Sequence, residues 1–188
     1  MENTGANLKV LYNREEVQQT VERLAKAISR DYQGKMPLLI GILKGSFIFM
    51  ADLVRYLTIP AEIEFVSLSS YGKGMETSGQ VKMALSLPCP IEGRDVIIIE
   101  DIIDTGLTMS YFLNYLQNQK PASLKLCALV DKPSRRKVPV SIDYLGFTVP
   151  DRFIVGYGID WAEKFRCLSE ICFVDKPLSS KARENNEV

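Results

Sequence analysis

The 188-residue sequence predicts an α/β fold in which a mostly parallel, twisted sheet is flanked by helices. Three features of the sequence point to this fold. Apolar runs, of which 96–99 is the clearest, are typical of strands buried on both faces of a parallel sheet. Stripes of apolar residues at helical spacing alternate with these runs. Acidic and hydroxyl side chains follow the run at 96–99, at the position where open α/β sheets bind ligands.

In the first half of the chain, a capping box of Asn13 and Glu16 begins a helix. Its predicted inner face is Val17, Val21, Leu24, Ala25 and Ile28. A buried strand is expected at 37–43. Ser46 is the candidate N-cap of the next helix, whose predicted inner face is Phe49, Met50, Leu53 and Leu57. Strands are expected at 61–68 and at 80–87, and the second has one more exposed face because apolar and polar residues alternate there.

In the second half, the strand that begins at Val96 leads into a helix. The predicted inner face of that helix is Met109, Phe112, Leu113 and Leu116. Further strands are expected at 124–130, 143–148 and 153–158. The polar tail at 179–188 is expected to fray.

Composition excludes several classes of protein. Hydrophobic residues make up 46% and charged residues 24%, as in ordinary globular domains, and the length suits one domain. The net charge of zero gives no electrostatic reason to expect a nucleic acid or a membrane surface as partner. No apolar run approaches the roughly 20 residues of a membrane span. The polar N-terminus shows no signal-peptide core, so a cytoplasmic location is expected.

The chain has no histidine, which excludes histidine-based triads and histidine acid–base catalysis. Any proton transfer must use Asp, Glu, Lys, Tyr or Cys. The four cysteines lack a C-x-x-C spacing and are interpreted as reduced thiols, with Cys127 in the core.

The loop after the strand at Val96 has the composition of a ligand site. It contains Glu100, Asp101 and Asp104, followed by the string Thr105-Gly106-Leu107-Thr108 where a helix begins. Free backbone N–H groups at a helix start, two threonine hydroxyls and a glycine together predict a phosphate cradle. Three carboxylates beside a phosphate repel one another and the ligand, so a divalent cation is expected, and the oxygen ligands indicate Mg²⁺. The alternative is that these acids are merely solvated at a strand end.

The string 96–108 resembles the phosphoribosyl-diphosphate (PRPP) binding motif of type I phosphoribosyltransferases, and its 100–106 part resembles the hypoxanthine(-guanine) members in particular. The segments 43–46, 69–72, 129–133 and 153–160 resemble further motifs of that family, in matching order and spacing. The resemblance implies a single domain over 1–188 with a type I phosphoribosyltransferase-like fold. Its core would lie at about 31–149, with a small hood from about 1–30 and 150–188. Members of the family are usually dimers or tetramers, so a homodimer or homotetramer is expected.

On the PRPP side, the resemblance implies that Glu100 and Asp101 accept hydrogen bonds from the ribose hydroxyls, directly or through Mg²⁺. It makes Asp104 the general base toward purine N7, and an ordinary aspartate is ionised at neutral pH. The phosphate-binding residues would be Thr105, Gly106, Leu107 and Thr108. Some family members have lysine where this chain has Leu107. The local positive charge is therefore lower here, but the backbone cradle stays intact.

The same resemblance implies that the backbones of Lys44 and Gly45 contact pyrophosphate, with a cis peptide at Leu43–Lys44. A Lys-Gly-Ser string is otherwise an ordinary turn. Ser70 and Tyr71 would lead a catalytic lid that excludes water from an oxocarbenium-like sugar, although composition alone favours a flexible hairpin loop.

On the purine side, Lys132 would donate to the 6-oxo group and reject the 6-amino group of adenine. Phe153 would stack on the base. The backbones of Ile154 and Asp160 would face the purine 2-position. The Asp160 side chain would bind the metal, and Arg166 would bind pyrophosphate. Without the family, Lys132 is a strand-end lysine, Phe153 a core residue and Arg166 a surface charge.

The sequence therefore predicts a cytoplasmic, Mg²⁺-dependent purine-salvage enzyme that transfers phosphoribosyl from PRPP to hypoxanthine, guanine or both. Its expected partners are PRPP and a 6-oxopurine, without nucleic acid or membrane. Two alternatives stay open. A PRPP- or nucleotide-sensing regulator would keep the binding motif without catalysis, although Asp104 and Lys132 are both present. An aspartate-nucleophile phosphatase would require D-x-D, whereas this chain has Glu-Asp-x-x-Asp.

Overall fold

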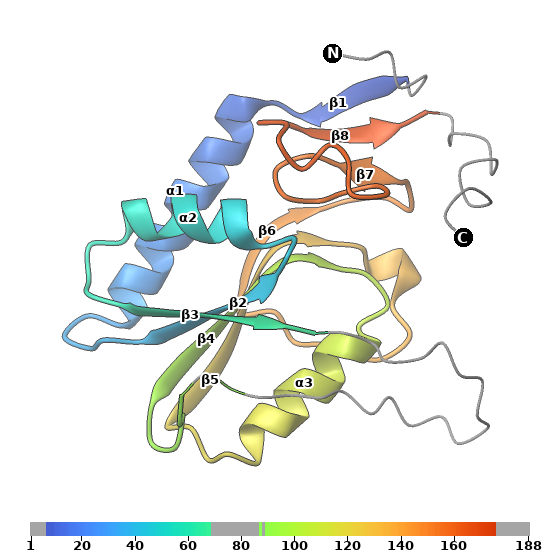
Figure 1. Ribbon diagram of the computed structural model, residues 1–188. Coiled ribbons are helices and arrows are strands. Elements are labelled where there is room, and N and C mark those ends of the chain that lie inside the picture. The colour runs from blue at the N-terminus through green and yellow to red at the C-terminus, as the bar shows by residue number, and fades with distance from the viewer. Residues whose placement is uncertain (1–6, 69–86, 88, 176–188) are drawn as a thin grey trace, which may run out of the picture.

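The computed structural model describes residues 7–68, 87 and 89–175. Its centre is a five-stranded, fully parallel sheet of order β3-β2-β4-β5-β6 (Figure 1). The strands are β2 (Leu38–Leu43), β3 (Glu62–Ser67), β4 (Asp95–Ile103), β5 (Ser123–Asp131) and β6 (Tyr144–Thr148). The predicted fold class is confirmed. The expected strand at 80–87 lies almost wholly outside the described residues.

Helices cover both faces of this sheet, with α1 (Arg14–Asp31) and α2 (Phe47–Tyr56) on one face and α3 (Leu107–Gln117) on the other (Figure 1). The side chains of β4 alternate between two cores. Ile97 and Ile99 pack in the cluster with α1 and α2, whereas Val96 and Ile98 pack in the cluster with α3. All four are fully buried, which explains why this strand reads as an unbroken apolar run.

The predicted capping box at the start of α1 is present. Asn13 Oδ1 accepts from Glu16 N at 3.0 Å, and Asn13 N donates to Glu16 Oε2 at 2.8 Å. Such a cap stabilises a helix by about 1 kcal/mol. Ser46 lies at the N-cap position of α2, as predicted, but its side chain makes no capping hydrogen bond. Its hydroxyl donates back to Ile42 O at 2.7 Å instead, because the turn after β2 brings that carbonyl within reach.

A second, smaller sheet is antiparallel, of order β1-β8-β7, and lies beside the carboxyl-end edge of the main sheet (Figure 1). Its strands are β1 (Leu8–Tyr12), β7 (Ile154–Val155) and β8 (Ile171–Val174). Neither β1 nor β8 was predicted, and the strand expected at 153–158 shortens to β7. Of the N-terminal elements, β1 joins the smaller sheet, where it pairs with β8. The helix α1 instead packs on α2 and on β6 of the main sheet.

Within the described residues, no helix has the length and apolar character needed to cross a membrane. Cys127 is fully buried, as predicted, and all four cysteines are free thiols.

Candidate active site

The strands β2, β4 and β5 are neighbours and parallel, so their carboxyl ends meet at one edge of the sheet. The loop at 43–46 follows β2, and Asp104 follows β4. Lys132 follows β5, and its backbone N–H donates to Ile103 O at 2.9 Å. Segments that lie far apart in the sequence therefore converge at this edge, where open α/β sheets bind ligands.

A cavity of about 260 Å³ opens at this edge between the loops. Gly106 begins α3 with φ 81°, a left-handed conformation that glycine adopts without the penalty of a Cβ atom. The N–H groups at the start of α3 can bind an anion, although the N–H of Leu107 also makes a long bond of 3.5 Å to Thr105 Oγ1. Predicted site residues that line the cavity are Glu100, Asp104, Thr105, Gly106 and Thr108. Leu107 is exposed and lies outside this lining, so any contribution to binding must come from its backbone.

Burial raises the pKa of two acidic side chains beside the cavity, Glu100 and Asp101, and within the described part of the chain only Asp101 has hydrogen bonds and a cation, Arg166, that oppose the shift. Glu100 as a residue is only partly buried, yet its Oε2 is shielded from solvent and has no hydrogen-bond partner among the described residues. Burial, followed by the charge of Asp101, raises the pKa of Glu100 well above its ordinary value. Burial raises the pKa of Asp101 to about 6. Buried carboxylates of this kind are stabilised by hydroxyl donors or a cation.

The loop after β2 packs directly against Asp101. The peptide Leu43–Lys44 is cis, as the family resemblance implied. A Cβ atom on Gly45 would collide with the Asp101 carboxylate, and a Cβ atom on Gly158 would collide with the Gly45 carbonyl. The glycines at 45 and 158 thus let three chain segments approach closely, which brings the backbone of 44–45 to the floor of the site.

The segment after β7 surrounds this loop with charged side chains. Arg166 Nη2 pairs with Asp160 Oδ1 at 2.8 Å, and Arg166 Nη1 donates to Gly158 O at 2.9 Å. Glu163 pairs with both Arg166 at 3.1 Å and Lys44 at 3.2 Å. Asp160 Oδ2 also accepts from Glu163 N at 2.9 Å. The predicted pyrophosphate residues therefore form one network, in which Glu163 is a member that the sequence did not single out.

The three predicted metal ligands are not gathered into a ready-made cage. Among the described residues, no group of three or more acidic, histidine or cysteine side chains is arranged to hold a metal ion. Glu100 and Asp101 are adjacent, whereas both oxygens of Asp160 are engaged by Arg166 and Glu163.

On the other side of Asp104, two predicted purine residues face each other. Lys132 is buried, and its Nζ lies 6.0 Å from the centre of the Phe153 ring, which is 57% exposed. Burial is the main cause that lowers the pKa of Lys132. Trp161, to which the sequence assigned no role, is tilted against Phe153 with ring centres 5.8 Å apart.

Two groups of predicted residues remain to be placed. Ile154 is buried in β7. Ser70 and Tyr71 lie outside the described residues.

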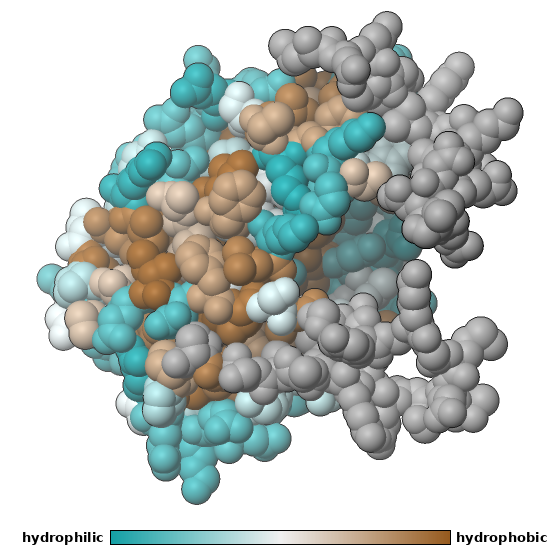
Figure 2. Space-filling model, in the orientation of Figure 1, coloured by the Kyte–Doolittle hydropathy of each residue, from teal (hydrophilic) through white to brown (hydrophobic). Residues whose placement is uncertain are grey.

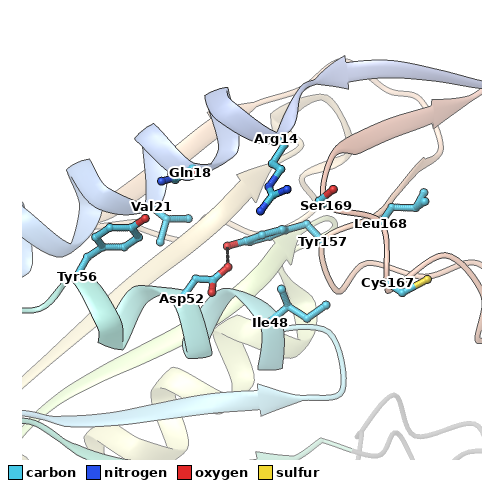
Figure 3. A pocket seen from close by; sticks show the side chains of 10 residues that line it. All are labelled: Arg14, Gln18, Val21, Ile48, Asp52, Tyr56, Tyr157, Cys167, Leu168 and Ser169. Atoms are coloured by element: carbon cyan, nitrogen blue, oxygen red, sulfur yellow. Dashed lines mark hydrogen bonds between the residues drawn. The ribbon is translucent and has the colours of Figure 1, made fainter.

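A larger cavity, of about 380 Å³, lies on the α1 and α2 side of the segment after β7 (Figure 3). The Tyr157 hydroxyl donates to Asp52 Oδ2 of α2 at 2.6 Å along one wall (Figure 3). Burial, followed by the bond to Asp52, raises the pKa of Tyr157, so the phenol stays protonated as a donor. Tyr157 precedes Gly158, so this bond fixes the backbone that presses on Gly45. The second cavity therefore lies behind the site and contains none of the predicted ligand residues.

Comparison with known proteins agrees with this arrangement. The sequence model of the phosphoribosyl transferase domain matches residues 7–161. The hypoxanthine-guanine phosphoribosyltransferase of Aquifex aeolicus is 46% identical over 172 residues, which are 91% of this chain and 97% of that protein. The protein of the same name from Bacillus subtilis is 47% identical over 163 residues, 87% of this chain and 91% of that protein.

Solved structures give the same result. A crystal structure of a hypoxanthine-guanine phosphoribosyltransferase from Bacillus anthracis matches with a TM-score of 0.82 at 47% identity, covering 88% of this chain and 98% of that chain. The Trypanosoma cruzi hypoxanthine phosphoribosyl transferase matches with a TM-score of 0.84 at 41% identity, over 94% of this chain and 95% of that chain. The chain therefore belongs to the phosphoribosyltransferase family, among its hypoxanthine-guanine phosphoribosyltransferases.

Proposed function

We propose that this protein transfers the 5-phosphoribosyl group from PRPP to N9 of hypoxanthine, guanine or both, which gives IMP or GMP and pyrophosphate in purine salvage. The observation that carries the proposal is the shared edge of β4 and β5. There, a cavity of about 260 Å³, lined by the start of α3 and by Glu100 with its unbonded Oε2, adjoins a buried lysine that faces an exposed aromatic ring. Family membership supports the same reaction.

In this proposal, PRPP binds first. Its 5-phosphate lies on the N–H groups and hydroxyls of the cradle at 105–108, and its ribose hydroxyls donate to Glu100 and Asp101. The pyrophosphate end lies against the backbone of Lys44 and Gly45, with Arg166 as the nearby cation. The collision that a Cβ atom on Gly45 would cause supports this placement, because only glycine allows the backbone and Asp101 to share the floor.

The purine enters between Phe153 and the sugar. Lys132 donates to its 6-oxo group, and the backbones of Ile154 and Asp160 face its 2-position. Asp104 takes or holds the proton on N7 while N9 attacks the anomeric carbon, whose configuration inverts. Bond breaking to pyrophosphate runs ahead of this attack. The carboxylates near the sugar stabilise the cation-like carbon.

Mg²⁺ fits the acidic pair. Glu100 Oε2 is shielded and has no hydrogen-bond partner among the described residues, and burial raises the pKa of Asp101 despite the charge of Arg166, so a further cation would stabilise both carboxylates. Mg²⁺ is commonly held by one or two carboxylates together with substrate oxygens and water, which suits a site without a complete protein cage. Glu100 and Asp101 would hold the ion, with Asp160 as a further ligand on the pyrophosphate side. When bound, Mg²⁺ offsets the negative charge of the diphosphate.

Two further predictions concern parts around the site. We infer that the segments at about 1–30 and 150–188, which contain the strands of the smaller sheet, form the hood over the base, while about 31–149 forms the core. Ser70 and Tyr71 would lead a lid that keeps water from the sugar. The cytoplasmic location also stays a prediction.

Self-association as a homodimer or homotetramer is part of this proposal. Figure 2 shows a hydrophobic area on the face of the molecule where α2 and β3 lie. Large hydrophobic side chains exposed in this part of the chain are Leu43, Phe47, Ile63 and Phe65. Such patches on a protein surface commonly mark an interface. Sedimentation velocity of the wild type and of Phe65→Ser would test it, because a monomeric wild type contradicts the prediction.

A pyrophosphate-release assay tests the proposed function. PRPP and Mg²⁺ are offered with hypoxanthine, guanine, xanthine and adenine in separate reactions. Release with the 6-oxopurines and not with adenine is expected, and the relative rates rank the substrates. Binding of PRPP without release for any base would contradict the enzyme and favour the sensing regulator. Release that is equally fast with adenine would contradict the role of Lys132.

A further inference from the structure

Arg135, to which the sequence reasoning gave no role, lies beside the proposed general base. It ends the short 3-10 helix η1 (Pro133–Arg135), which begins directly after Lys132. Arg135 Nε lies 3.1 Å from Asp104 Oδ1, and Arg135 Nη1 lies 3.6 Å from Asp151 Oδ1. One guanidinium therefore spans the loop after β4 and the loop that carries Phe153.

The contact with Asp104 affects only one of its two oxygens. Asp104 Oδ1 is shielded from solvent and has no aligned hydrogen-bond donor among the described residues, so Arg135 is the cation that compensates it. The Asp104 side chain as a whole is still 42% exposed and lines the cavity. This leaves Oδ2 as the oxygen that a purine N7 proton can reach. An ion pair at one oxygen favours the carboxylate orientation that presents the other oxygen to the cavity.

The contact with Asp151 concerns the balance of charge around Lys132. Burial lowers the pKa of Lys132, and so does Arg135, whereas Asp104 and Asp151 raise it. Two acids thus face two cations. Arg135 occupies both acids and repels Lys132, so loss of its charge would leave Lys132 freer to approach them. Its ammonium group would then be drawn from the face of Phe153, where the 6-oxo group is expected, toward the carboxylates.

We propose that Arg135 is a positioning residue of the transfer reaction: it holds Asp104 through Oδ1 so that Oδ2 faces purine N7, and it shares Asp151 so that Lys132 stays free for the 6-oxo group. The proposal rests on the proposed function. It predicts that Arg135 acts through Asp104 and affects the purine half of the reaction, not the PRPP half.

The test is a double-mutant cycle on kcat/KM for hypoxanthine. Arg135→Met keeps the apolar stem and removes the charge. It is expected to lower kcat/KM by about 10- to 100-fold, as misplacement of a catalytic group does, with the KM for PRPP changed less than about twofold. In the Asp104→Asn background, the same change is expected to have less than about a threefold effect, because no ionised base remains to be positioned. Arg135→Lys should recover part of the loss.

Lys137→Met is the matched control, since Lys137 is an exposed cation of the same loop and should stay within about twofold of wild type. Equal effects of Arg135→Met in the two backgrounds would overturn the proposal and make Arg135 a general structural residue. An unchanged single variant would overturn it too. If the wild type released no pyrophosphate, the proposed function itself would fail. If the wild type were active but the effects of the Arg135 and Asp104 variants were simply additive, only the role of Arg135 would fail.

Discussion

Two parts of the candidate site are built in opposite ways. The loop at 100–108 is continuous in sequence: a buried strand, an acidic turn and a helix start supply most of the cavity lining, which Ile42, Leu43 and Leu68 complete. The segment at 156–168 has almost no regular structure, and its backbone is paired through isolated bridges and turns. Its residues reach the site through contacts with distant chain segments. The first part can be recognised as a string of residues, and the second only as a packed arrangement.

The backbone of the second part shows what this packing requires. Tyr157, Ala162, Glu163 and Phe165 have positive φ although none is glycine. Such conformations are uncommon for these residue types and tend to occur where function requires them. Gly158 lies in contact with the Gly45 carbonyl, and Lys44 pairs with Glu163 across 119 residues of sequence. The comparison teaches that a strand and a helix frame one half of the site, with bonds from Arg136 and Lys137 supporting its loop, whereas the other half depends mainly on tertiary contacts.

The largest effect is expected in the continuous part. Asp104→Asn should bind PRPP nearly normally but lose about 10²- to 10⁴-fold in kcat, because an amide cannot take the N7 proton. Isothermal titration with PRPP and steady-state kinetics with hypoxanthine separate the two quantities. Turnover within threefold of wild type would remove Asp104 from its role.

In the packed part, Gly158→Ala should lower the free energy of unfolding by roughly 2–4 kcal/mol and weaken PRPP binding, because the new Cβ would collide with the Gly45 carbonyl. Gly34→Ala is the matched control. Gly34 also has positive φ, 76°, but a Cβ atom there would meet nothing within 4 Å, so only a conformational cost of about 1 kcal/mol is expected. Chemical denaturation measures both. Equal losses of unfolding free energy in the two variants would show that the positive φ, and not the contact with Gly45, determines the cost at Gly158.

Lys132 links the two parts: its backbone N–H donates to Ile103 O, next to Asp104, and its ammonium group faces Phe153, which packs against Trp161 of the second part. Lys132→Ala should lower kcat/KM for hypoxanthine by about 10- to 30-fold and change PRPP affinity little, because one hydrogen bond to the base is lost. Discrimination against adenine should weaken. Competition between hypoxanthine and adenine in one assay measures it. A change confined to PRPP affinity would contradict the purine role.

The sequence predicted the parts of the molecule whose signal is local. The parallel sheet follows from apolar runs such as 96–99, and the cavity lining follows from one string. By contrast, β1 and β8 are short, and β1 pairs with β8 from the opposite end of the chain, so neither carries a periodic pattern long enough to recognise. Arg135 and Glu163 are charged residues in loops, and only their folded neighbours distinguish them from solvated surface charges. The roles assigned to the site residues remain predictions until variants are measured.

Asp101 belongs to the first part by sequence and to the second by contact, and it yields the smallest expected effect. Its pKa is raised from 3.8 to about 6 in the folded state, chiefly by burial. The folded protein therefore binds this proton more tightly than the unfolded chain does. The associated stability is fully present below pH 3.8 and is lost as the pH rises through about 6.

Asp101→Asn has no such proton to lose. Relative to wild type, the variant should gain about 1–2 kcal/mol between pH 4 and pH 7 in the absence of ligand, while it binds PRPP and Mg²⁺ more weakly. Denaturant unfolding of both proteins at matched pH values gives the difference, in which other titrating groups cancel. A constant difference across this range would mean that Asp101 is not the group that burial perturbs. A stability difference that grows with pH would show that the folded site disfavours the charged form of Asp101. A ligand or cation that binds this carboxylate would relieve that cost.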